Sequence, residues 1–345
     1  MTAHANGSDD RRPVVLILRF SALGDVAMTS PVVTAAARRH PSARFVVVTR
    51  GCFAPFFPPE VEVESVDLKS YKGLGGLLRL ARELRHKYRP AAVADLHDVI
   101  RTRVIRSLMR LAGIPVATID KGRADKKALV SGTRREQLVS TPSRYADTLA
   151  RIGFDPGIPV PAPLGPAHPD DSKPRIGIAP FAAHQGKAYP LGKMAQAAAM
   201  IRAERPDARI YWFCAPGEET ERVSAIAAEG DTVVPTLGLP GGLAGELDLM
   251  ATLHVMVSMD SGNMHLAALH GVPVVSLWGP THPYAGFAGT TSPDRLRVQT
   301  TMPCRPCSIY GNRPCRVSDD GTYPCIGSIA PEAVARITLS TLPPR

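Results

Sequence analysis

Residues Met259–Pro283, MDSGNMHLAALHGVPVVSLWGPTHP, form the stretch from which the fold can be worked out. The apolar run Val255–Met259 leads into the turn and is typical of a buried parallel strand. Asp260-Ser261-Gly262 then turns the chain, and Asp260 or Ser261 can cap a helix that begins near Asn263. Val274–Trp278 follows as a second apolar run, so the stretch predicts a strand, a helix and another strand.

The turn between the first strand and the helix is a candidate anion site. A helix that opens at the carboxyl end of a parallel strand presents free backbone N–H groups and the positive end of its dipole, and these suit a diphosphate. The carboxylate of Asp260, beside the turn, suits sugar hydroxyls instead.

Strands and helices alternate on both sides of one Pro-rich segment, Asp155–Lys173, which lacks periodicity and is the predicted linker. Before it we expect strands at Val14–Leu18, Phe45–Thr49, Val61–Leu68 and Ala91–Leu96, and helices at Val26–Arg39, Leu77–Tyr88 and His97–Ala112. After it we expect strands at Arg175–Pro180 and Arg209–Ala215, and helices at Met194–Glu204, Glu218–Glu229 and Leu243–Leu253. This rhythm predicts an α/β protein with two doubly wound parallel sheets, in domains 1–160 and 161–345, and a ligand cleft between their strand ends.

The length and composition are compatible with two domains. The chain has 345 residues and an apolar fraction of 44%, and no apolar run approaches the length of a membrane-spanning helix. Its first fifteen residues are polar and include an Asp pair, which argues against a secretory signal and predicts a cytoplasmic location.

The charge is divided unevenly along the chain. Residues 1–170 hold 26 Lys and Arg against 16 Asp and Glu, whereas residues 171–345 hold 15 of each. The whole excess of +10 therefore lies in the first half, which indicates a polyanionic partner such as nucleic acid, anionic lipid or a phosphorylated acceptor.

The loop Ser21-Ala22-Leu23-Gly24-Asp25 follows the first predicted strand and precedes a helix. Gly24 permits a sharp turn, and Asp25 is then placed at the rim of the cleft, where a carboxylate can act as a general base on an incoming hydroxyl. The alternative is that Asp25 only caps the helix.

Two further loops after predicted strands carry charged candidates. Lys187, in the Gly-hinged segment His184–Pro190, can meet a phosphate as a point charge, or it can be an ordinary solvated lysine. Glu218, after Ala215-Pro216-Gly217, can hold ribose hydroxyls, or it can simply favour the dipole of the following helix.

Four cysteines lie near the carboxyl end: Cys304, Cys307, Cys315 and Cys325. A CxxC pair followed by two more cysteines can bind a structural zinc ion, although the second short CxxC of a zinc ribbon is missing. Disulfides are less expected in a cytoplasmic chain, and reduced thiols that pack a small loop are the third alternative. The sequence contains no P-loop, dinucleotide fingerprint or hydrolase elbow.

Two of these motifs together resemble glycosyltransferase family 9, the heptosyltransferases. Arg19–Asp25 is similar to the family's "R-x-S-x-x-G-D" loop, and Asp260–Ala268 with Gly279-Pro280-Thr281 is similar to its "D-S-G-P-M-H-L-A-A … G-P-T" signature. The motifs occur in the family's order, about 235 residues apart, and the resemblance spans essentially the whole chain.

The resemblance implies a GT-B fold and an inverting single displacement that requires no metal or other cofactor. A heptose would pass from an ADP-sugar, held mainly by the second domain, to a lipopolysaccharide core acceptor bound by the first. Asp25 would be the base, Lys187 would neutralise the departing diphosphate, Glu218 would hold the ribose and Asp260 the heptose. The remaining candidate binding residues are Ser21, Gly24, Ser261, Gly262, Asn263, Met264 and His265.

The sequence departs from the family pattern at two places. Asn263 stands where the family usually has Pro, which loosens the turn or adds a hydrogen bond to the sugar. Pro180–Ala183 lacks the hydroxyl side chains that some members place before the lysine, so phosphate contacts there would come from the backbone. Both departures bear on the identity of the donor sugar.

The basic residues of the first half have a candidate partner in this family. The acidic inner core, or the anionic inner face of the membrane that carries it, would attract them, so we expect a monomer that associates peripherally with the membrane. The seven residues concerned are Arg101, Arg103, Arg106, Lys121, Arg123, Lys126 and Lys127.

Two other functions remain as alternatives. A nucleotide-sugar epimerase of GT-B fold would turn over its nucleotide sugar without an acceptor. A zinc-stabilised nucleic-acid-binding module would use the basic residues and the cysteines, but these lie at opposite ends of the chain and no series of aromatic residues accompanies them.

Overall fold

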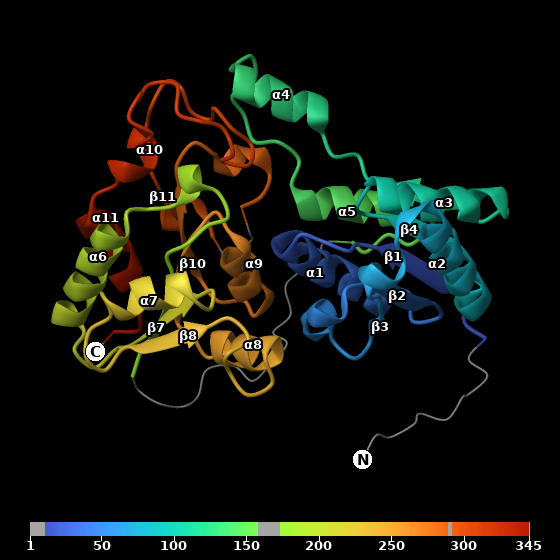
Figure 1. Cartoon of the computed structure of the whole chain (residues 1–345), viewed down its shortest axis with the longest axis horizontal. Coiled ribbons are helices and arrows are strands. Elements are labelled where there is room, and N and C mark those ends of the chain that lie inside the picture. Colours follow the sequence, from blue (N-terminus) through green and yellow to red (C-terminus); the bar gives the residue numbers. More distant parts are fainter. Residues whose placement is uncertain (1–10, 158–172, 289–291, 345) are drawn as a thin grey trace. The chain divides into compact units, whose positions relative to one another are not determined.

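The computed structural model describes residues 11–157, 173–288 and 292–344 (Figure 1). These residues belong to two compact units. The first comprises Met1–Ser21, Val32–Ile119 and Tyr145–Pro159, and the second comprises Ala22–Pro31, Asp120–Arg144 and Val160–Arg345. Most of the predicted linker, Asp155–Lys173, lies outside the described residues.

The first unit contains a parallel sheet of five strands in the order β3-β2-β1-β4-β5. Its strands are β1 (Val14–Leu18), β2 (Arg44–Thr49), β3 (Glu62–Ser65), β4 (Ala92–Asp95) and β5 (Val116–Thr118). Strand β1 is at the centre and its residues are all buried, which is why it is continuously apolar rather than alternating.

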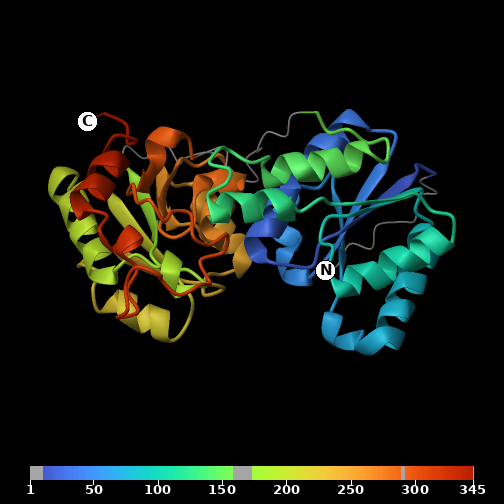
Figure 2. The same ribbon diagram turned by 90° about the horizontal axis from the view of Figure 1, so that it is seen from above.

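The helices of this part of the chain are α1 (Leu23–Arg39), α2 (Gly73–Tyr88), α3 (Ile100–Leu111) and α5 (Thr141–Ala150). Figure 2 shows α2 and α3 side by side on one face of the five-stranded sheet and α5 on the other. Leu80 and Leu84 of α2 and Ile105 of α3 pack on Leu16 and Leu18 of β1 in one buried cluster. The sheet is therefore covered on both faces, as a doubly wound sheet requires.

The second unit contains a parallel sheet of six strands in the order β11-β10-β9-β6-β7-β8. Its strands are β6 (Arg175–Ala179), β7 (Arg209–Cys214), β8 (Thr232–Pro235), β9 (Val255–Met259), β10 (Val274–Trp278) and β11 (Arg297–Gln299). The two tryptophans, Trp212 and Trp278, are fully buried in it. Each indole N–H has a partner, Asp231 at 2.9 Å and Ser276 at 2.8 Å respectively, so neither ring leaves an unsatisfied donor in the core.

The helices of the second unit are α4 (Arg123–Ser131), α6 (Leu191–Glu204), α7 (Glu218–Ser224), α8 (Leu243–Ala251), α9 (Gly262–Leu269), α10 (Pro324–Gly327) and α11 (Pro331–Leu339). Helices α6 and α11 pack side by side (Figure 1). Helix α9 connects β9 to β10, and the carboxyl end of β9 therefore meets its first turn. No helix in the described residues is long and apolar enough to cross a lipid bilayer.

The predicted α/β class with two doubly wound parallel sheets is confirmed. The predicted strand at Val61–Leu68 is shorter, at Glu62–Ser65, and the predicted helix at Glu218–Glu229 ends at Ser224. The sequence did not predict β5, β8, β11, α4, α5, α10 or α11. Three of these are strands of only three or four residues, which are too short to show a periodicity.

Candidate active site

The turn between β9 and α9 has the predicted form, with one difference at the helix cap. Ser261 is the residue that precedes the helix, but its side chain does not cap it. Its hydroxyl lies 3.2 Å from the hydroxyl of Ser258 instead. The first N–H groups of α9 are therefore not capped by the Ser261 side chain, which leaves them suited to an anion.

Asp260 and Lys187 form an ion pair at this turn. Lys187 Nζ lies 3.3 Å from Asp260 Oδ2, and the two side chains are only 14% and 6% exposed. Lys187 comes from the loop after β6, and Asp260 comes from the end of the neighbouring strand β9. The fold thus joins two residues that lie 73 positions apart in the sequence.

His265 is buried in the first turns of α9, close to both members of this pair. Burial lowers the pKa of its imidazole, and the positive charge of Lys187 lowers it further. The carboxylates of Asp260 and Asp25 act in the opposite direction without outweighing the burial. His265 is therefore neutral near pH 7 and can both donate and accept a hydrogen bond.

The two sequence motifs meet at two glycines. A Cβ atom on Gly24 would lie 2.6 Å from His265 Cδ2, and one on Gly262 would lie 2.6 Å from Leu23 Cδ2. At Gly24 a side chain would meet the imidazole ring, and at Gly262 it would displace the end of the Leu23 side chain. Leu23 and Gly24, from the part of the "R-x-S-x-x-G-D" loop that belongs to the second unit, therefore pack directly against the "D-S-G-N-M-H" turn.

Asp25 is the third residue of α1 and is not its cap. The positive end of the helix dipole favours a carboxylate at this position. Its backbone carbonyl accepts the hydroxyl of Thr29 at 3.0 Å. Its charge acts on His265, on which Asp260 and Lys187 also act, and separately on Lys126.

The structure gathers most of the predicted site residues but not all of them. Asp25, Gly24, Lys187 and the residues of the α9 turn, including the buried Met264, come together in the second unit. Ser21 belongs to the first unit, where its hydroxyl lies 3.4 Å from Nε2 of His97. The Glu218 side chain is 84% exposed at the start of α7, and its partner at 3.8 Å is Arg222.

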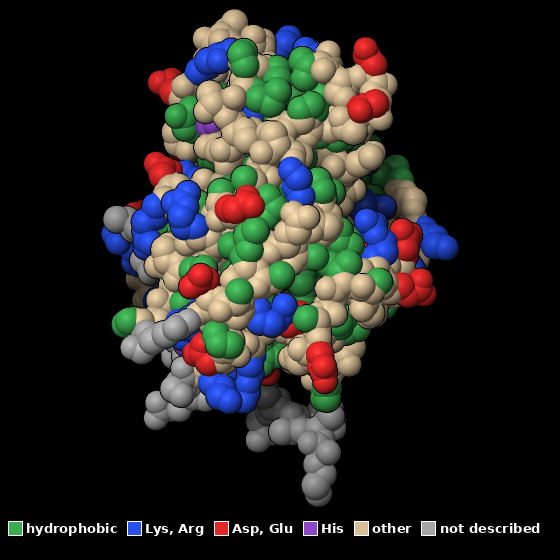
Figure 3. All heavy atoms as spheres, turned by 90° about the vertical axis from the view of Figure 1, so that its left-hand side faces the viewer, with side chains coloured by type: hydrophobic (Ala, Val, Ile, Leu, Met, Phe, Trp, Pro, Cys, Tyr) green, Lys and Arg blue, Asp and Glu red, His purple; other side chains and the backbone are tan. Residues whose placement is uncertain are grey.

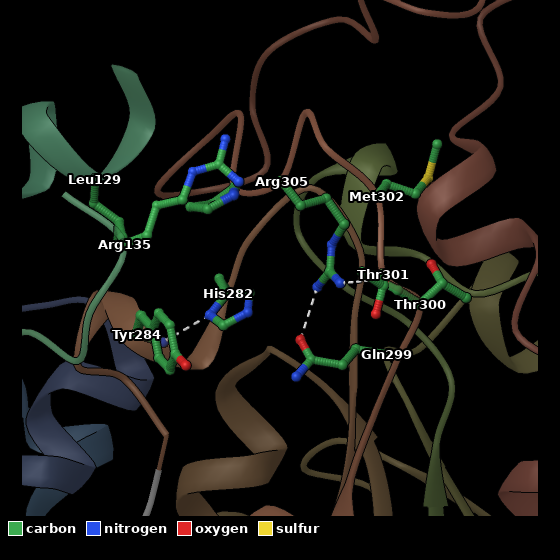
Figure 4. A pocket seen from close by; sticks show the side chains of 10 residues that line it. Leu129, Arg135, His282, Tyr284, Gln299, Thr300, Thr301, Met302 and Arg305 are labelled. Atoms are coloured by element: carbon green, nitrogen blue, oxygen red, sulfur yellow. Dashed lines mark hydrogen bonds between the residues drawn. The ribbon is translucent and has the colours of Figure 1, made fainter. Parts of the chain in front are cut away.

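Arg305, which the sequence analysis did not single out, holds the Gly279-Pro280-Thr281 loop. Its buried guanidinium donates to the backbone carbonyls of Trp278 and Thr281 at 3.2 and 3.1 Å, and also to that of Gly279. Gln299 accepts a further bond at 3.1 Å (Figure 4). The only sequence signal for this role is an arginine within the CxxC pair.

Figure 4 shows that Arg305 lies beside a cavity of about 210 Å³ lined also by His282 and Tyr284. Burial lowers the pKa of His282 to about 4, and Arg305 and Arg297 add to this effect. The backbone N–H of Tyr284 donates to Nδ1 of His282 at 3.1 Å. The imidazole is therefore neutral and fixed in orientation.

The four carboxyl-terminal cysteines line one small cavity. All four are free thiols, and Cys325 is buried. Burial raises the pKa of Cys325 to about 11 and raises that of Cys307 as well. No group of three or more metal-binding side chains within the described residues is arranged to hold an ion.

Comparison with known proteins agrees with the two motifs. Residues 116–313 match the model of glycosyltransferase family 9 (heptosyltransferase). Lipopolysaccharide heptosyltransferase 1 of Pseudomonas aeruginosa is 31% identical over 313 residues, which is 85% of this chain and 85% of that protein.

Solved structures resemble the whole fold. A family 9 glycosyltransferase from Veillonella parvula aligns with 96% of this chain and 97% of its own, with a TM-score of 0.72 and 19% identity. The E. coli heptosyltransferase WaaC, solved with ADP, aligns with 95% of this chain and 100% of its own, with a TM-score of 0.63 and 17% identity. These likenesses confirm the predicted GT-B fold.

The family match covers more than half of the chain, and the Pseudomonas relative exceeds 30% identity over most of both sequences. The chain therefore belongs to glycosyltransferase family 9 and is a glycosyltransferase.

Proposed function

We propose that this enzyme transfers a heptose, with inversion, from ADP-heptose to the core of a lipopolysaccharide acceptor. The observation that carries the proposal is the packing of Gly24 against His265, an imidazole on which Asp25, Asp260 and Lys187 all act electrostatically. The relatives are named as heptosyltransferases, and one was solved with ADP. The first domain, 1–160, would bind the acceptor, and the second, 161–345, the donor.

The donor diphosphate has two sources of positive charge in this proposal. One is the uncapped first turn of α9, and the other is the ammonium of Lys187. Lys187 pairs with Asp260. A bound diphosphate would compete for the lysine and free the Asp260 carboxylate to accept hydrogen bonds from heptose hydroxyls.

Asp25 would act as the general base on the acceptor hydroxyl. A carboxylate removes the proton as the oxygen attacks the anomeric carbon, and the bond to the ADP oxygen breaks on the opposite face of the sugar. General-base assistance contributes roughly 10²–10⁴ in rate. Stabilisation of the developing diphosphate charge by Lys187 and α9 is expected to be the larger effect.

The remaining candidates have supporting roles in this proposal. The backbone of Ser261, Gly262 and Asn263, with the neutral His265, would line the sugar and diphosphate. Glu218 is exposed and available to a ribose. No metal or other cofactor takes part in the proposed step.

Peripheral association with an anionic membrane surface is part of the proposal, but the structure narrows the residues that can contribute. Arg106 is bound to Asp95 at 2.7 Å and to Asp98 at 3.0 Å, and Arg103 is bound to Asp98 at 3.1 Å. These two arginines form ion pairs with carboxylates of the first unit. The other five predicted residues stay part of the proposal, which is made for a monomer: Arg101, Lys121, Arg123, Lys126 and Lys127.

The test of the base is the substitution Asp25→Asn. We expect the variant to bind ADP-heptose as the wild type does and to lose transfer by about 10²–10⁴-fold, because the amide cannot accept the proton. Calorimetric titration of the donor and a transfer assay on isolated acceptor measure the two properties separately. Loss of donor binding together with transfer would assign Asp25 a structural role.

An assay with the nucleotide sugar and no acceptor distinguishes a transferase from an epimerase. An epimerase would change the stereochemistry of its nucleotide sugar in the absence of acceptor, and a transferase would not. Nucleic-acid binding has less support, because two of the first-half arginines are paired with carboxylates.

A further inference from the structure

A cavity of about 610 Å³ lies in the second unit between α4 and the loop that carries the cysteines. Five cationic side chains line it, and no carboxylate does. Three come from α4 and two from the loop: Arg123, Lys126, Lys127, Arg313 and Arg316. They are here called the basic cavity.

The carboxylate on α4 is already paired with arginines outside the basic cavity. Asp125, the one carboxylate of α4, is already bound by Arg134 at 2.9 Å and by Arg144 at 3.3 Å. Within the part of the chain that the structure describes, Lys127, Arg313 and Arg316 form no ion pair. By contrast, basic and acidic side chains are interspersed on the face shown in Figure 3.

Lys126 is the cation of the basic cavity whose charged form is disfavoured, mainly by burial. Its ammonium lies 4.6 Å from the centre of the Phe287 ring. Burial lowers its pKa to about 8, and the positive charges of Arg144 and Lys121 add to the effect against the carboxylates of Asp25 and Asp120. An anion bound beside Lys126 would favour its charged form and raise its pKa.

The basic cavity adjoins the proposed catalytic residues. Gly311, in the same loop as Arg313, lies so close to Lys187 that an added Cβ would overlap the aliphatic part of the lysine side chain. The Asp25 carboxylate acts electrostatically on Lys126. An anion held in the basic cavity is therefore near the base and near the site assigned to the donor diphosphate.

We propose that the basic cavity binds a phosphorylated sugar of the acceptor and so positions the neighbouring sugar for attack. Guanidinium groups pair with phosphate oxygens in a bidentate manner, and the volume is in the range of small-molecule sites. Asn312 and the hydroxyl of Tyr310 line the same cavity and suit sugar hydroxyls. The inference rests on the proposed function, since it names the part of the acceptor that the enzyme recognises.

The test uses the double variant Arg313→Gln/Arg316→Gln, whose side chains are exposed on a loop. With the native acceptor we expect KM to rise by about tenfold or more, because each charged hydrogen bond contributes a comparable factor. The KM for ADP-heptose should not change. Arg336→Gln, an exposed arginine on α11, is the matched control and should behave as the wild type.

A second acceptor, from which the phosphates have been removed, isolates the proposed contact. The variant and the wild type should bind it equally, because the group that the arginines recognise is gone. An unchanged KM for the native acceptor, or the same rise with both acceptors, would overturn the inference. Loss of binding to anionic vesicles with normal acceptor kinetics would instead assign the cavity to lipid headgroups and also overturn it.

A binding measurement decides the matter even if the proposed transfer activity is not found. Titration with glucose 6-phosphate in saturating ADP keeps the diphosphate site occupied. We expect wild-type binding that weakens with salt and is lost in the double variant. Equal binding by both proteins, or by neither, would refute the basic cavity as a sugar-phosphate site whatever the transfer assay shows.

Discussion

Gly24 is the residue at which the loop carrying Asp25 meets the turn carrying Asp260. The His265 ring occupies the space that a Cβ would need. In Gly24→Ala the ring or the start of α1 must shift, which we expect to destabilise the protein by about 1–3 kcal/mol. Transfer should fall by on the order of 10²-fold, because a displacement of about 1 Å is enough to misalign a base. Urea unfolding and the transfer assay measure the two effects.

The matched control for Gly24 is Gly192→Ala, at the second position of α6. No atom lies within 4 Å of the Cβ that this substitution adds. Alanine is the better helix former, so stability should stay constant or rise by about 0.4–1 kcal/mol. Equal losses of activity in the two variants would mean that close packing at Gly24 is unimportant.

The pair Lys187–Asp260 makes a separate prediction at the same scale. In Lys187→Met the buried Asp260 carboxylate loses its partner, which we expect to cost about 3–5 kcal/mol. Adding Asp260→Asn removes the unpaired charge and should restore most of the stability, but not the transfer. Urea unfolding of the wild type, both single variants and the double variant gives the coupling energy. A cost below about 1 kcal/mol for Lys187→Met would contradict a buried, interdependent pair.

At the scale of elements, the sequence predicted the strands and helices whose signals lie in neighbouring residues. It missed the contacts that join residues far apart in the chain. The strand Val255–Met259 and the helix after it have local signals, namely an apolar run and good helix formers. The role of Arg305 has none, because its carbonyl partners at Trp278 and Thr281 lie 27 and 24 residues away. Ser261 occupies the predicted cap position, but its hydroxyl does not cap the helix, because it lies within hydrogen-bond distance of the Ser258 hydroxyl instead. The sequence does not show this competition.

Helix α8 contains a buried carboxyl group, Glu246, whose Oε2 has no hydrogen-bond partner within the described residues. Burial raises its pKa from 4.5 to about 7, against a backbone hydrogen bond from Leu237. The folded state therefore keeps a proton that the unfolded state has lost between pH 4.5 and 7. Stability is highest below this window and falls as the pH rises through it, by roughly 3 kcal/mol.

The substitution Glu246→Gln removes this titration. We expect the free energy of unfolding of the variant to change much less than that of the wild type between pH 5 and pH 8. Urea unfolding at both pH values measures the difference, and all other titrating groups are common to the two proteins. Parallel pH profiles would show that Glu246 does not keep its proton in the folded state.

For the whole molecule, the alternation of strands and helices predicted the fold class. The distribution of charge along the sequence did not show which basic residues can bind a ligand. A count of basic residues cannot separate Arg106, which is bound to two carboxylates, from Arg316, which forms no ion pair with any residue described. It also missed the two arginines that the neutral second half contributes to the basic cavity. Pairing is set by tertiary contacts, so only the structure identifies the charges that remain for a ligand.

Nucleotide selectivity is a property of the whole folded chain and is the broadest test of the proposed function. A ligand that binds only the folded state stabilises it by RT ln(1 + [L]/Kd), or about 2.7 kcal/mol at a hundredfold excess over Kd. We expect ADP to raise the melting temperature by several degrees, and GDP and UDP to raise it less. Lys187→Met should reduce the ADP effect, whereas Arg313→Gln/Arg316→Gln should keep it, because the diphosphate and the acceptor phosphate are assigned to different cations. Equal shifts with all three nucleotides, or none with ADP, would contradict an ADP-sugar donor.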